Sequence, residues 1–160
     1  MVDAPAALIR ETPRAFDVLT RVPPGARLVL VADDYAAPHL NPGEFAIVAP
    51  LAEGARLRDG DAVAIRYTSG RTCCVRITRH NDGPLHGTIR HRRGRKPEPC
   101  WYTGPMKPND PASWDRRARG EPVRVLLSDG PMYESYLRQM MLGRVIGVFR
   151  ATQAEPVRSA

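Results

Sequence analysis

DAVAIRYTSGRTCCVRIT, residues 61–78, carries the clearest structural signal in the chain. Two runs rich in β-branched and apolar residues flank a Ser-Gly dipeptide at 69–70 that is typical of a hairpin turn. The pattern therefore predicts two antiparallel strands joined by a tight turn. Because side chains alternate along a strand, Val75 and Ile77 share one face, opposite Arg76, and we expect the face of Val75 and Ile77 to be the buried one.

Further short strands are predicted on both sides of this hairpin, wherever an apolar run is bounded by turn residues. With the hairpin, the predicted strands are 27–32, 44–48, 61–67, 71–78, 123–128 and 141–150. In the last of these, Gly143 and Gly147 predict bulges or a close approach of another backbone. We therefore predict a mostly β fold, a partly closed barrel or sandwich of short antiparallel strands.

The length of 160 residues fits one domain, which we place at 27–151. Residues 1–26, interrupted by Pro13, are predicted to form an N-terminal arm with at most one or two helical turns, and 152–160 a tail. Residues 80–122 are rich in Pro, Gly, His and Arg and form a long basic insertion, in which only 85–90 resembles a strand.

The insertion carries the densest positive charge of a chain whose net charge is +7. Five positive residues in seven suggest contacts with phosphates, and two aromatic residues just beyond them could stack on bases. The other interpretation is a solvated loop. The predicted nucleic-acid-binding residues are Arg90, Arg92, Arg93, Arg95, Lys96, Trp101 and Tyr102.

Several other classes of protein are disfavoured. No apolar run reaches the ~18 residues of a membrane span, and the N-terminus lacks the features of a signal peptide. Three cysteines cannot form a disulfide framework, so reduced thiols and a cytoplasmic location are expected. No cofactor or metal is expected, because the spacings of His80, His86, His91 and Cys100 match no zinc motif.

Several separated segments together resemble, in order, the motifs of one known family of serine peptidases. The family motif G-D-S-M-x-P, followed by G-D and a strand, is similar to VADDYAAP at 31–38 and GEFAIV at 43–48. Its D-G-D element resembles 59–65, and its lysine-bearing strand resembles Val-Arg-Ile at 75–77. Its final two segments resemble VRVLLSDGPMY at 123–133 and LGRVIGVFR at 142–150. The family that these segments resemble is that of LexA, UmuD and the phage repressors, peptidase family S24. The resemblance implies a LexA or signal-peptidase-like fold and a homodimer.

The two catalytic positions of that family are substituted here. In the family a serine attacks the peptide carbonyl and a neutral lysine accepts its proton, whereas this chain has Tyr35 and Arg76 at those positions. Arginine is effectively never deprotonated in proteins, so Arg76 cannot act as a base. We expect the Tyr35 ring to fill the former cleft and Arg76 to stack on it or pair with Asp34. The alternative is a phosphoryl-transfer pair.

The leading hypothesis is a catalytically inactive domain that acts as a binding or regulatory module and contacts nucleic acid through its insertion. One alternative is an active, autoproteolytic member of the family with an unrecognised dyad. Another is a nucleic-acid-binding protein unrelated to peptidases. An apolar cluster near the C-terminus belongs either to the core or to a dimer face: Met132, Tyr133, Tyr136, Leu137, Met140 and Met141.

Overall fold

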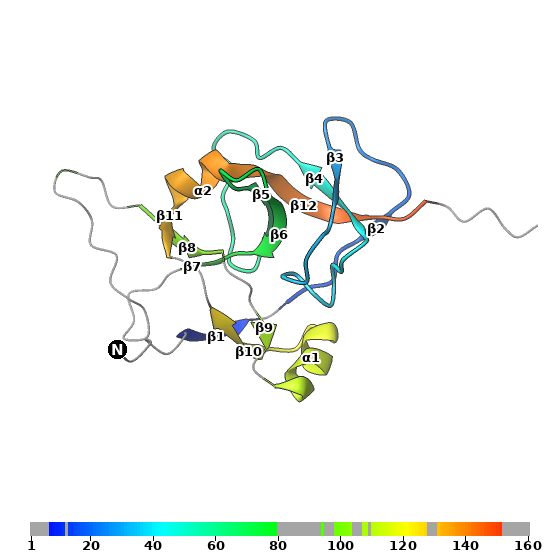
Figure 1. Ribbon diagram of the computed structural model, residues 1–160, viewed down its shortest axis with the longest axis vertical. Helices are drawn as coiled ribbons and strands as arrows, with labels where there is room; N and C mark the ends of the chain where they lie inside the picture. The colour runs from blue at the N-terminus through cyan, green and yellow to red at the C-terminus, as the bar shows by residue number, and fades with distance from the viewer. Residues whose placement is uncertain are drawn as a thin grey trace, which may run out of the picture.

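The protein is built mostly of β strands, and the largest sheet curls into half a barrel (Figure 1). The computed structural model describes residues 7–11, 13–79, 94, 98–103, 107–108, 110–127 and 131–151. The elements are β1 (Ala7–Glu11), β2 (Val18–Leu19), β3 (Arg27–Leu30), β4 (Phe45–Ala49), β5 (Ala62–Arg66), β6 (Thr72–Arg76), β7 (Thr78–Arg79), β8 (Cys100–Tyr102), β9 (Lys107–Pro108), α1 (Pro111–Ala118), β10 (Val123–Leu127), β11 (Met132–Tyr133), α2 (Glu134–Met140) and β12 (Met141–Phe149). The predicted mostly β class is confirmed, and the strands predicted at 27–32, 44–48, 61–67, 71–78, 123–128 and 141–150 each correspond to an observed one.

Strand β12 holds the large sheet together, in the order β3-β4-β12-β5-β6. It pairs antiparallel with β4 and β5, and its C-terminal end also pairs in parallel with β2. Its register shifts next to Gly143 and Gly147. A Cβ on Gly143, whose φ is +155°, would collide with the carbonyl oxygen of Ala49, and a Cβ on Gly147 would lie 2.9 Å from the carbonyl oxygen of Asp17. The predicted bulges and close backbone approach are both confirmed.

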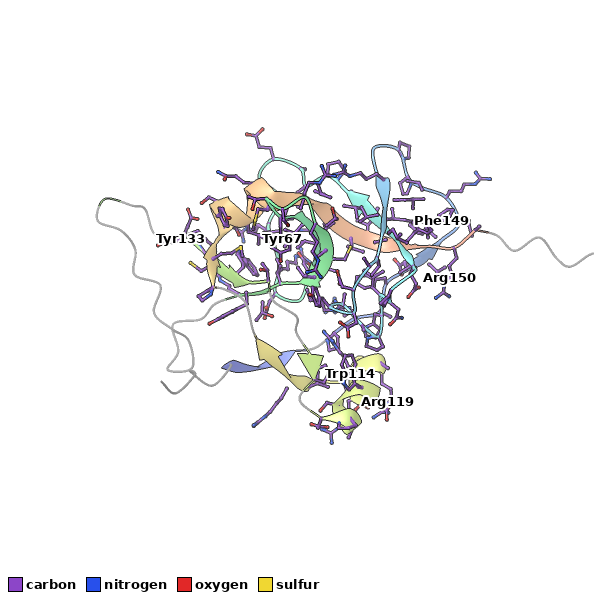
Figure 2. All side chains as sticks on the ribbon, in the orientation of Figure 1. Tyr67, Trp114, Arg119, Tyr133, Phe149 and Arg150 are labelled. Atoms are coloured by element: carbon purple, nitrogen blue, oxygen red, sulfur yellow. The ribbon has the colours of Figure 1, made fainter. Side chains whose placement is uncertain are left out.

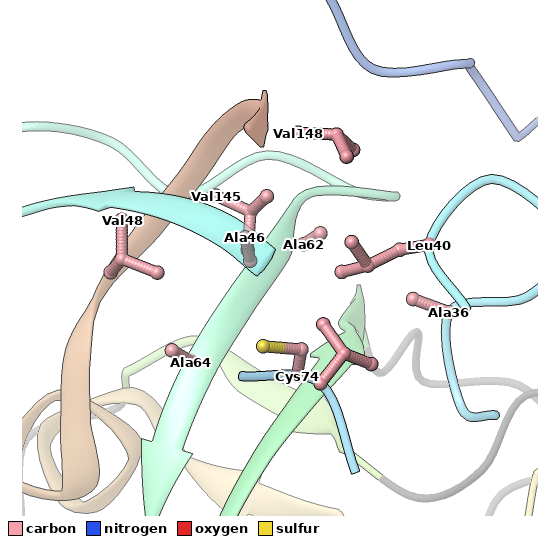
Figure 3. Packing of buried hydrophobic residues seen from close by; sticks show 10 residues of the cluster. Ala36, Leu40, Ala46, Val48, Ala62, Ala64, Cys74, Val145 and Val148 are labelled. Carbon is pink, nitrogen blue, oxygen red and sulfur yellow. The ribbon is translucent and has the colours of Figure 1, made fainter. Parts of the chain in front are cut away.

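Both faces of β6 are buried, whereas the sequence led us to expect one. On one face Val75 packs in a cluster that includes Trp101 and Leu137. On the other face Cys74 packs with residues of β4, β5, β12 and the loop after β3 (Figure 3). Arg76 is only 2 % exposed. The expectation was incomplete because two separate parts of the chain cover the strand, the β3–β4 loop on one side and β8 with α2 on the other.

The small sheet β11-β8-β7 and helix α2 supply one of these covers. Trp101 on β8 and Leu137 on α2 have 2 % and 0 % of their surface exposed. Leu137 belongs to the C-terminal apolar cluster, and its burial assigns that cluster mainly to the core, although Tyr136 is 49 % exposed. Three partly buried methionines pack against the same cluster: Met132, Met140 and Met141.

The third sheet, β1-β10-β9, lies beside helix α1. Strand β1 pairs along its whole length with β10, so the N-terminal residues form strands rather than the helical turns we expected. The cause is long-range pairing, which overrides the weak helical pattern of this segment. The basic insertion likewise contains β8, β9 and α1, and Asp110 caps α1 by accepting a hydrogen bond from the backbone N–H of Ser113. The predicted strand 85–90 lies outside the described residues.

Candidate functional site

The loop between β3 and β4 carries the position at which the resemblance expects a nucleophile. Its base is closed by two backbone hydrogen bonds, from Val31 to Glu44 and from Gly43 to Val31. Within the loop the Asn41 side chain donates to a carboxylate oxygen of Glu44 at 2.9 Å. These hydrogen bonds hold the base of the loop that carries Tyr35.

Tyr35 is engaged by Arg71, a residue that the sequence did not single out. The Nη2 of Arg71 donates to the Tyr35 hydroxyl at 3.2 Å, and its guanidinium carbon lies 5.9 Å from the centre of the ring. The tyrosine backbone N–H donates to the Asp33 carboxylate, also at 3.2 Å. The expected stacking of Arg76 on Tyr35 is thus wrong. The arginine over this ring is the exposed Arg71, which the hairpin turn positions.

Arg76 instead connects three separate segments of the chain. Its guanidinium donates to the carbonyl oxygens of Gly60 at 3.0 Å and Arg14 at 2.7 Å. It also lies 3.3 Å from Nδ1 of His39 and 4.8 Å from the centre of the Phe16 ring. These contacts use the charge and the planar fork of arginine, so the side chain holds the N-terminal segment to the sheet. Its predicted pairing with Asp34 stays a prediction.

His39 completes this arrangement as a neutral imidazole. Burial lowers its pKa, and the charges of Arg76 and Arg117 lower it further. A neutral ring can accept at Nδ1 from Arg76 while its Nε2–H donates to the carbonyl oxygen of Ala118, 3.2 Å away. One tautomer satisfies both contacts, which links β6 to helix α1 through a single uncharged ring.

Asp33 and the thiols of Cys73 and Cys74 form a buried group of interacting side chains, and Tyr35 packs against the cluster that contains Cys73. Asp33 is 9 % exposed, and burial raises its pKa. Burial also raises the pKa of Cys73 to about 11 and that of Cys74 to about 12. Both thiols therefore stay protonated at neutral pH, and neither is a nucleophile.

No serine–lysine pair is found among the described side chains. Lys96 and the side chain of Lys107 lie outside them, and the sequence contains no further lysine. The hydroxyl of Ser113 donates to Asp110 at 2.8 Å, and that of Ser135 donates to a carboxylate at 2.6 Å. These two hydroxyls are used to order the first turns of helices rather than to face a base.

The predicted nucleic-acid residues fall into two groups. Trp101 and Tyr102 are 2 % and 5 % exposed, and the indole N–H of Trp101 donates to Glu134 at 3.1 Å. Their predicted role in stacking on bases is wrong, because both rings are buried. Strand β8 runs between β7 and β11. The chain has few aromatic residues, and it uses these two rings in its core. The basic residues of the prediction lie outside the described residues: Arg90, Arg92, Arg93, Arg95 and Lys96.

A cleft of about 260 Å³ opens elsewhere, between the β4–β5 connection and the start of β12. It contains neither Tyr35 nor Arg76. Its lining residues are Pro50, Leu51, Arg138, Met141, Leu142 and Gly143. Within the described part of the chain, no three His, Cys, Asp or Glu side chains are grouped to hold a metal ion, and no helix is long and apolar enough to cross a bilayer.

Three residues that the sequence did not single out contact the two predicted dyad positions: Arg71, His39 and Phe16. None of them belongs to a recognisable motif, and each approaches its partner only through the folding of distant segments. Comparison of the chain with models of known families, with curated proteins and with solved structures finds no match.

Proposed function

We propose that this protein is a LexA-type domain that does not hydrolyse peptides and acts in the cytoplasm as a binding or regulatory module. The order of the resembling segments supports the family relationship, because most of them form neighbouring strands of one curled sheet. The β3–β4 loop also packs on β6, where Ala36 and Leu40 join Cys74 in one cluster. The loop and the strand are therefore neighbours, with Tyr35 packed against the cluster of Cys73 and Val75 and with Arg76 on the opposite face of β6.

The main support for the proposal is the set of contacts made by the side chains at the two dyad positions. Tyr35 accepts a hydrogen bond from a guanidinium, and Arg76 donates to two carbonyl oxygens from a site that is 2 % exposed. Peptide hydrolysis by the family mechanism needs a hydroxyl that loses its proton to a neutral amine. Arg76 remains protonated, so the step that activates the nucleophile has no acceptor.

Self-cleavage is the activity that tests this proposal. Purified protein is incubated at mildly alkaline pH, where loss of a proton from an amine base is favoured, and its intact mass is followed by mass spectrometry. We expect one unchanged mass for the wild type and for Tyr35→Ala. A fragment formed by the wild type but not by Tyr35→Ala would refute the proposal and favour the alternative, an active autoproteolytic peptidase.

A second candidate function is nucleic-acid binding through the basic insertion. The net charge of +7 and the five positive residues between 90 and 96 favour it. The test is a fluorescence titration of labelled DNA or RNA at several salt concentrations. Affinity should fall steeply as salt rises and fall again when Arg92, Arg93 and Arg95 are replaced by Ala. Absence of binding at low salt would exclude this function, whether or not the chain is related to peptidases.

A further inference from the structure

One face of the large sheet is covered over part of its width and open over the rest. On β5 this face carries Val63, which belongs to one cluster with Trp101 on β8 and Leu137 on α2. The face continues across β12, because Arg144 is paired both with Val63 and with Ala49 on β4. Directly paired residues point to the same face of a sheet. The surface that α2 covers on β5 therefore extends beyond the helix onto β4 and β3.

The open part of this face carries a row of apolar side chains. Phe45 shares the face with Ala49, because side chains alternate along β4. Phe45 is paired with Phe149 on β12 and with Leu30 on β3, and Phe149 is paired with Leu19 on β2. Figure 2 labels Phe149 at the C-terminal end of β12, near β2. The row therefore crosses four neighbouring strands.

The row is exposed to solvent toward β3. Phe45 is 42 % exposed and Leu30 is 56 % exposed, and Leu28 on the same face of β3 is 39 % exposed. Val63, on the part of the face that α2 covers, is fully buried. A sheet face that is apolar over its whole width packs against a second layer. The open part lacks that layer among the described residues, so it marks an interaction surface.

The shape of the open part fits a helix that lies across the strands. A strand added to the edge of the sheet at β3 would reach Leu30 but would leave Phe45 and Phe149 uncovered. The row spans the gaps between β2, β12, β4 and β3, a width of about 14 Å. A helix rises about 15 Å in about ten residues, so three turns cover the row. A helix is also the element that packs on the covered part, where α2 inserts Leu137.

The charges around the row are positive. Between residues 18 and 32 the only charged residues are Arg21, in the β2–β3 loop, and Arg27, at the start of β3. Both are exposed, and within the described part of the chain neither has an acidic partner. Arg150 directly follows β12, and its side chain is 65 % exposed, with Glu44 3.5 Å away. A partner with acidic residues on both sides of an apolar stripe complements this surface.

We propose that this open part of the sheet face docks an acidic amphipathic helix of a partner protein. The apolar stripe of the helix covers Leu28, Leu30 and Phe45, and its flanking carboxylates face Arg21 and Arg27. Docking completes over β3 and β4 the layer that α2 begins over β5. The inference names a partner for the binding role proposed above and rests on that role, but not on the loss of peptidase activity.

NMR titration of the isotope-labelled protein tests the proposal with synthetic peptides. The first peptide is a helix of about four turns with leucines in one stripe and glutamate and alanine elsewhere. It should shift the backbone amide signals of Leu28, Leu30 and Phe45 and leave those of α2 unchanged. The same stripe with lysine in place of glutamate should bind several-fold more weakly. A peptide of the first composition with its leucines spread around the helix should shift none of these signals.

Protein variants locate the contact. Leu30→Lys places a charge in the row at a position that is more than half exposed, so it should keep the wild-type circular dichroism spectrum and lose binding of the glutamate peptide. Tyr136→Lys makes the same kind of change at a residue of similar exposure on α2 and should bind as the wild type does. Arg27→Glu should reduce the preference for the glutamate peptide over the lysine peptide.

Several results would overturn the proposal. They are no shift at millimolar glutamate peptide, equal binding of the peptide without a stripe, and equal loss of binding in Leu30→Lys and Tyr136→Lys. Shifts of Leu28, Leu30 and Phe45 on dilution of the protein alone would assign the face to a second copy. Shifts of these residues with a single-stranded DNA oligonucleotide but not with the peptide would assign it to nucleic acid. None of these results bears on the test of self-cleavage by mass, so the two proposals fail separately.

Discussion

Replacing Arg76 by Met gives the most direct test of the role that the structure assigns to this side chain. Methionine keeps an unbranched apolar side chain but removes the charge and the donors. The carbonyl oxygens of Gly60 and Arg14 and the Nδ1 atom of His39 lose their donor, and the stacking on Phe16 is lost. If Arg76 holds the N-terminal segment to the sheet, the variant must be clearly less stable than the wild type.

The size of the loss follows from these contacts. A buried acceptor left without a donor costs about 1–3 kcal/mol. Water can reach the exposed Arg14, which leaves two acceptors in the interior, and the lost stacking adds up to about 2 kcal/mol. Removing a buried charge offsets part of the cost. We therefore expect the free energy of unfolding to fall by about 3 kcal/mol. For a chain of this size that corresponds to a decrease of about 6–12 °C in Tm.

The assay is urea unfolding followed by tryptophan fluorescence, because the buried Trp101 becomes exposed on unfolding. Arg71→Met is the matched control. It makes the same substitution on the same hairpin, but Arg71 is exposed and donates to the Tyr35 hydroxyl from the surface. This control should unfold at the urea concentration that unfolds the wild type. If Arg76→Met unfolds there too, the contacts of Arg76 do not stabilise the fold, and the role assigned to this side chain is refuted.

Three further predictions concern other parts of the chain. Gly143→Ala should lower the free energy of unfolding by about 3 kcal/mol or more, from a backbone collision at positive φ, whereas Gly54→Ala, with open space around it, should cost about 1–2 kcal/mol in calorimetry. His39 has a pKa below 6.5 in the folded state, so its contribution to stability is complete above pH 6.5 and should disappear as pH falls through the folded pKa. Urea titrations at several pH values should show this slope, and His39→Gln should flatten it. Cys73 and Cys74, with pKa values of about 11 and about 12, should resist a thiol reagent at pH 8 in the folded protein and react at once in urea; fast labelling of the native state would contradict their burial.

The strands could be predicted because their signals are local. The hairpin at 61–78 has a turn dipeptide between two apolar runs, and Gly143 and Gly147 interrupt a strand at the points where β12 bulges. The N-terminal strand could not be predicted, because Ala7–Glu11 is a strand only through its pairing with β10 more than 100 residues later. No property of the segment itself distinguishes it from a short helix.

Only part of the candidate site can be predicted from the sequence, because the other contacts form between distant segments. Position in a motif identified Tyr35 and Arg76, but motif spacing says nothing about the contacts of their side chains. The partner of Tyr35 is 36 residues away, and one acceptor of Arg76 is 62 residues away. The basic residues near Trp101 in the sequence predict an exposed ring. In the fold, the ring instead fills the cluster between β6 and α2.

The position of β12 in the sequence has a consequence for biosynthesis. The hairpins β3–β4 and β5–β6 leave the ribosome well before residues 141–149, yet β12 is the strand that joins β4 to β5. Until it emerges, the inner edges of both hairpins lack their neighbour and are open to wrong pairing. The sheet can close only after β12 has emerged, so chains that stall before that point should be the species that chaperones and proteases meet.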